Sequence, residues 1–188
     1  VFISSKFAEL PRAKQQAILD RAALAHLPVL GLIFGNPDWV LESKRAGVRG
    51  RIVQSLDALL ELDWGKELEL VTVFDVEPHA REWRQATGWD GDLSGYSSVM
   101  ADEIVPRVAE YQEKFKARYG RPVFYEPLPV ISFEPHWWVN GHETEDGLTS
   151  KNLKHPLRIG IAGMTYQPTV QRILSVSARV WGRTVPVE

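Results

Sequence analysis

Apolar runs alternate with amphipathic segments along the first half of the chain. Residues 11–26 are rich in Ala, Gln, Lys and Leu, which favour a helix, and Pro11 suits its opening turn because a helix leaves that N–H unpaired. The uninterrupted apolar run Val29–Phe34 predicts a strand that is covered on both faces. Leu68–Phe74, which is rich in β-branched and apolar residues, predicts a second interior strand.

The segments between and after these strands predict helices. Asp38 is a suitable N-cap for a short helix that runs to Lys44. The Gly47–Gly50 segment predicts a break, and a second helix with one apolar side follows from Arg51 to about residue 63. Residues 77–87 predict a further helix, ended by a glycine. Helices and strands therefore alternate over residues 11–88, which favours an α/β layer architecture.

The second half of the chain predicts more strands, flanked by two amphipathic helices. A Gly-, Asp- and Ser-rich stretch at residues 90–96 is the best candidate for a loop or subdomain junction. Helices are expected over 104–119 and 170–181, where apolar residues recur every three or four positions. Two short strands are expected within 123–139 and another over 157–162. We therefore predict one α/β or α+β domain over residues 1–188, with a mixed sheet flanked by amphipathic helices.

Composition and charge narrow the function. The 188 residues are 44% hydrophobic and 24% charged, which is typical of a globular protein and excludes a disordered, collagen-like or coiled-coil chain. The formal net charge of −2 gives no reason to expect nucleic acid as a partner. With no cysteine, the chain has no disulfide framework, thiolate metal site or cysteine nucleophile. No apolar run reaches the roughly 20 residues of a membrane span and no signal peptide is visible, so we expect a soluble, cytoplasmic protein.

A basic, glycine-containing segment is the first candidate site. Glycines let a turn present several N–H groups together, and a following helix N-terminus adds partial positive charge, so such a segment suits phosphate or carboxylate. The alternative is a solvated basic turn without a ligand. The residues of this candidate anion site are Arg45, Gly47, Arg49, Gly50 and Arg51.

The same region resembles the acyl-coenzyme A site of the GNAT family of N-acetyltransferases. That site consists of a strand, a glycine-containing turn, a helix, a strand and a helix that ends in an aromatic and glycine pattern. The order here is Leu30–Phe34, Gly47–Gly50, the helix from Arg51, Leu68–Phe74 and 80–89. The resemblance covers about 60 residues and implies that an acyl-coenzyme A pyrophosphate would lie at the Gly47–Gly50 turn.

An acidic and aromatic segment, residues 134–146, is the second candidate site. Adjacent Trp residues on a strand point to opposite faces, which leaves one indole for contact with a partner. Imidazoles beside carboxylates also suit a divalent metal, and a metal-bound water could hydrolyse a substrate. The candidate contact residues are Trp137, Trp138, His142, Glu143, Glu145 and Asp146, and the candidate metal ligands are His136, His142 and Glu143. An ordinary strand and loop is the third interpretation.

These observations favour a binding function over a specific reaction. We predict an accessory or interaction protein that binds a macromolecule or a polar small molecule through the 134–146 segment. The alternative is an enzyme, either an acyltransferase that uses the Gly47–Gly50 turn or a metal-dependent hydrolase. The pattern identifies no cofactor.

Overall fold

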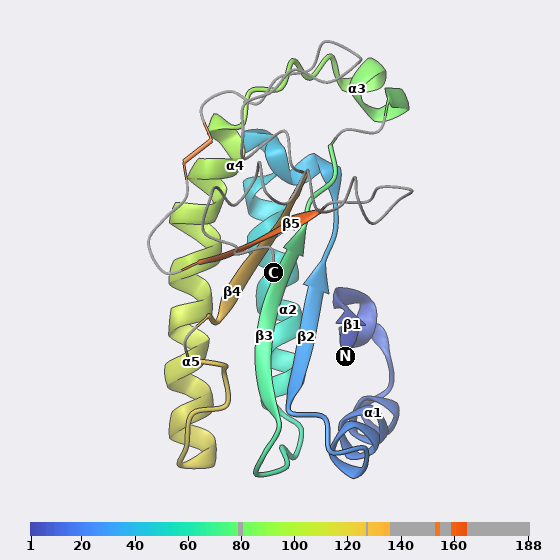
Figure 1. Ribbon diagram of the computed structural model, residues 1–188, viewed down its shortest axis with the longest axis vertical. Helices are drawn as coiled ribbons and strands as arrows, with labels where there is room; N and C mark the ends of the chain where they lie inside the picture. Colours follow the sequence, from blue (N-terminus) through green and yellow to red (C-terminus); the bar gives the residue numbers. More distant parts are fainter. Residues whose placement is uncertain (79–80, 127, 136–152, 155–158, 165–188) are drawn as a thin grey trace, which may run out of the picture.

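The computed structural model describes residues 1–78, 81–126, 128–135, 153–154 and 159–164. They form a five-stranded sheet in the order β1-β2-β3-β4-β5, in which every pair of neighbours is parallel. The α/β class predicted from the alternating pattern is thus confirmed (Figure 1). The elements are β1 Phe2–Ser4, η1 Ser5–Glu9, α1 Arg12–Leu24, β2 Val29–Phe34, η2 Pro37–Val40, η3 Glu42–Lys44, α2 Arg45–Leu60, β3 Glu69–Asp75, α3 Arg81–Thr87, α4 Ser94–Val99, η4 Met100–Ile104, α5 Val105–Tyr119, β4 Val130–Pro135 and β5 Gly160–Met164.

One face of the sheet packs against α2 and α5. Leu30, Leu32 and Phe34 alternate along β2 and are fully buried with apolar residues of both helices in one core. Their partners on β3 in the same register include Leu70 and Phe74. The two helices contact each other, and Figure 1 shows α2 behind the strands and α5 beside it. The crossovers from β2 to β3 and from β3 to β4 therefore place their helices on the same side.

The opposite face of the sheet is curved. The rings of Phe2 on β1 and Phe133 on β4 meet edge to face, with centroids 6.0 Å apart, although two strands separate them. Strands lie about 4.8 Å apart, so β1 and β4 of a flat sheet are about 14 Å apart. Gly31 gives room for the contact, because a Cβ there would lie 2.3 Å from the Phe2 ring. Sequential strand order, helices on one side and this curvature are features that the described open sheet shares with β/α barrels.

The expected break at Gly47–Gly50 is wrong, because α2 runs without interruption from Arg45 to Leu60. Each glycine costs a helix about 1 kcal/mol relative to alanine. The helix forms nonetheless because a stripe of its residues packs on the sheet and supplies stabilisation that local propensity does not contain. The buried residues of the stripe are Val48, Ile52, Ser55, Leu56 and Leu59.

The remaining elements follow the sequence with local differences. Two 3-10 turns, η2 and η3, replace the short helix expected from Asp38, and Asn36 rather than Asp38 provides the cap. Helix α5 ends at Gly120, whose φ of 67° suits glycine. Residues 88–93 connect α3 to α4, which begins within the expected junction at 90–96. The helix predicted over 170–181 lies outside the described residues.

Candidate functional site

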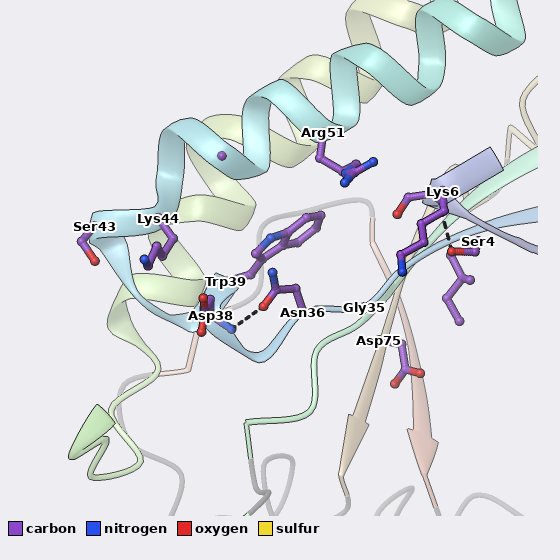
Figure 2. Close-up of a pocket in the computed structure, with 13 residues that line it drawn as sticks. Ser4, Lys6, Gly35, Asn36, Asp38, Trp39, Ser43, Lys44, Arg51 and Asp75 are labelled. Carbon is purple, nitrogen blue, oxygen red and sulfur yellow. Dashed lines mark hydrogen bonds between the residues drawn. The ribbon is translucent and has the colours of Figure 1, made fainter. Parts of the chain in front are cut away.

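A cavity of about 650 Å³ opens at the carboxyl ends of β1, β2 and β3. In parallel sheets this edge is where α/β proteins bind their ligands, because the loops that leave the strands converge there with their polar groups. Here the loops after β1 and β2 and the first turns of α2 form the walls (Figure 2). The residues that line it are Ser4, Ser5, Lys6, Ile33, Gly35, Asn36, Asp38, Trp39, Ser43, Lys44, Gly47, Arg51 and Asp75.

Trp39 forms an apolar wall of the cavity. Phe34 and Phe74, which stack on each other at the ends of β2 and β3, hold the indole at centroid distances of 5.8 and 5.9 Å. The side chain is only 6% exposed, and its N–H makes no hydrogen bond to another described residue. An N–H without a protein partner is free to donate a hydrogen bond to a ligand acceptor beside it.

Short hydrogen bonds fix the loop that follows β2. The Asn36 side-chain oxygen accepts a bond from the backbone N–H of Asp38 at 2.9 Å, which leaves the amide nitrogen as a donor. The Asp38 carboxylate accepts a bond from the Trp83 indole N–H of α3 at 2.7 Å. Trp83 in turn packs edge to face against Trp89. The loop is therefore braced from outside the cavity, which holds Asn36 and Asp38 in place at its rim.

Cations reach the cavity from three elements. Lys6 comes from η1, Lys44 from the end of η3 and Arg51 from the second turn of α2. Arg51 forms an ion pair with Glu9 at 2.7 Å, whereas neither lysine has an ion pair with another described residue. Asp75, the last residue of β3, provides a carboxylate on the same cavity (Figure 2). The site thus combines positive groups with acceptors for hydroxyl or amine groups.

The residues of the predicted anion site lie on two different sides of α2. Gly47 and Arg51 line the cavity, as neighbours four positions apart on one face of α2. Arg45 instead pairs with Asp102, and Arg49 binds Glu103 through two short hydrogen bonds, both on the side of α2 that contacts η4. Gly50 does not line the cavity. Arg45 and Arg49 therefore join elements of the fold.

The other predicted sites lie outside the described residues. This holds for the contact residues Trp137, Trp138, His142, Glu143, Glu145 and Asp146 and for the metal ligand candidate His136. Among the residues that the structure describes, no cluster of His, Asp and Glu could hold a metal ion. Within the same part of the chain, no helix has the length and apolar character of a membrane span.

Sequence reasoning missed most of the cavity. Ser4, Asn36 and Asp75 lie at or just after the ends of strands that are separate in the sequence. The signal that could have found them is the abrupt change from a buried run to polar side chains, at residues 35–38 and again at Asp75. Because the carboxyl ends of parallel strands meet at one edge of the sheet, those changes predict a shared site.

Comparisons of the chain with protein-family models, with curated proteins and with solved structures found no significant match.

Proposed function

We propose that this protein binds a small polar organic molecule in the cavity at the carboxyl ends of β1, β2 and β3. The observation that carries the proposal is the cavity itself, with a volume of about 650 Å³ and a lining of hydroxyl, amide, carboxylate and cationic groups around one indole. That volume falls within the range of about 300–1,000 Å³ typical of small-molecule sites.

Rigid support of the cavity wall favours ligand binding over an accidental hollow. The indole of Trp39 is held by two core rings, and Asp38 is held by Trp83. Groups that are fixed before binding lose little conformational entropy when a ligand arrives. A site at this edge is also compatible with catalysis, because carboxylates such as Asp38 and Asp75 are suited to acid and base roles.

The two glycines of α2 offer a matched pair of variants that test the proposal. A Cβ at either Gly47 or Gly50 would meet no atom within 4 Å, so a side chain at either position begins in open space. Only Gly47 lines the cavity. Gly47→Leu should fill the cavity and Gly50→Leu should leave it open, while both raise helix propensity equally.

The measurement is isothermal titration with D-glucose, D-gluconate, D-glucose 6-phosphate, glycine and inorganic phosphate as probes. We expect saturable binding of at least one probe to the wild type and to Gly50→Leu, and at least tenfold weaker binding to Gly47→Leu. The proposal is wrong if no probe binds, or if Gly47→Leu binds as well as Gly50→Leu does.

The sequence-based interpretations stay predictions. A partner surface at 134–146 is tested by replacing Trp137 or Trp138 together with Glu143 and measuring capture of a partner. The acyltransferase interpretation has lost the turn on which it depended, because Gly47 and Gly50 lie within α2. A rise in the unfolding temperature on addition of acetyl-coenzyme A would support it.

A further inference from the structure

The charges of the cavity indicate what kind of molecule it takes, on the condition that the proposed function is right. We propose that the ligand is a polyhydroxylated molecule with a negatively charged group, a carboxylate or a phosphate. The anionic group lies among Lys6, Lys44 and Arg51, and the hydroxyls face Asp38 and Asp75.

The first argument is the balance of charge in the lining. Three cationic side chains and two carboxylates line the cavity, and Lys6 and Lys44 have no carboxylate partner among the described residues. Figure 2 shows Lys6 of η1 and Arg51 of α2 on one side of the Trp39 indole, and Lys44 on the other side. Cations that converge on one concave space raise the local concentration of anions.

The second argument is the end of α2. This helix of 16 residues has no side-chain cap and no acidic residue in its first turn, although both features are common at helix N-termini. Its positive end therefore adds to the field of Lys44, the residue that precedes it. Gly47 in the same turn lines the cavity without a side chain, which allows a ligand to approach the backbone.

The third argument is independent of charge. The indole N–H of Trp39, a largely buried residue that lines the cavity, has no partner among the described residues. Together with the amide nitrogen of Asn36, it makes the middle of the cavity rich in donors. The carboxylates of Asp38 and Asp75 accept hydrogen bonds when ionised and so suit ligand hydroxyls.

The test compares the charged and neutral probes. D-gluconate or D-glucose 6-phosphate should bind at least tenfold tighter than D-glucose, and tighter than inorganic phosphate, which lacks hydroxyl-bearing carbons. Lys6→Gln and Lys44→Gln should each lower the affinity for the anionic probe by about two- to fivefold. The double variant should lower it by about tenfold. Lys14→Gln on α1, which is exposed and does not line the cavity, is the control with the same charge change and should bind like the wild type.

The outcomes separate this inference from the proposed function. Binding of D-glucose or glycine alone, blocked by Gly47→Leu, overturns the inference and leaves the proposed function standing. Equal affinity for inorganic phosphate and D-glucose 6-phosphate overturns the polyhydroxyl part. Equal effects of Lys44→Gln and Lys14→Gln overturn the assigned position of the charge. Absence of any saturable binding overturns the proposed function itself.

Discussion

The buried carboxylate of Glu103 joins two elements of the helical layer, α2 and η4. Glu103 is 6% exposed, and both of its oxygens accept hydrogen bonds from the Arg49 guanidinium, at 2.6 and 2.7 Å. Hydrogen bonding to Arg49 lowers the pKa of Glu103 below its usual value, and this effect outweighs the opposing effect of burial. The pair links α2 to η4, so its strength depends on pH.

Lowering the pH should remove the stabilisation that the Glu103–Arg49 pair provides. Because the pKa of Glu103 is lower in the folded protein, the carboxylate stabilises the fold above its unfolded pKa, and the stabilisation is lost as the pH falls from about 5 to 3. Urea denaturation at pH 7, 5, 4 and 3 should show Glu103→Gln less stable than the wild type at pH 7, with the difference shrinking toward pH 3. A constant difference across this range would contradict the prediction.

A glycine of α4 that packs against the backbone of the η2–η3 loop leaves no room for a side chain. A Cβ on Gly95 of α4 would lie 2.5 Å from the backbone oxygen of Val40 and 3.1 Å from the backbone nitrogen of Glu42. Backbone atoms cannot swing aside as side chains do, so Gly95→Ala must displace the η2–η3 loop. We expect it to lower the free energy of unfolding by about 1–3 kcal/mol, measured by guanidinium denaturation. An unchanged free energy would show that the loop moves at no cost.

Helix α2 shows how packing overrides local propensity. Its two glycines are unfavourable for a helix, and so is positive charge near its N-terminus, yet a buried stripe from Val48 to Leu59 holds it on the sheet. Gly50 is exposed and a Cβ there meets no atom within 4 Å, so this glycine has no packing role.

Replacement of Gly50 should therefore stabilise the protein. Gly50→Ala should raise the free energy of unfolding by about 0.5–1 kcal/mol, since alanine loses less backbone entropy in a helix. Gly50→Pro should lower it by about 3 kcal/mol, because proline removes a helical hydrogen bond. Thermal unfolding followed by circular dichroism checks both variants. If Gly50→Pro were neutral, the chain would have the turn that the sequence first indicated.

The whole sheet curves toward the face that lacks α2 and α5. The contact between Phe2 and Phe133 depends on this curvature, because the two residues lie on β1 and β4. The cavity itself lies at the carboxyl ends of β1, β2 and β3, which are direct neighbours in the sheet.

A double-mutant cycle tests in solution the ring contact that this curvature allows. Phe2→Ala, Phe133→Ala and the double variant should give a coupling energy of about 0.5–1.5 kcal/mol, as expected for an edge-to-face ring pair. Each free energy comes from urea denaturation at neutral pH. Additive effects of the two substitutions would mean that the rings do not touch and that the sheet is flatter.

The amino-acid sequence by itself determined the α/β class, the interior strands at Val29–Phe34 and near Leu68–Phe74, and the end of α5 at Gly120. The strands and the class depend on hydrophobic periodicity, and the end of α5 depends on a backbone conformation that few residues other than glycine adopt. Both are local properties of the sequence. The continuity of α2 and the site were decided by tertiary structure. Helix propensity is a local quantity and does not include the contacts that form when α2 packs on the sheet. Lys6, Trp39 and Asp75 line one cavity only because parallel strands end at one edge of the sheet.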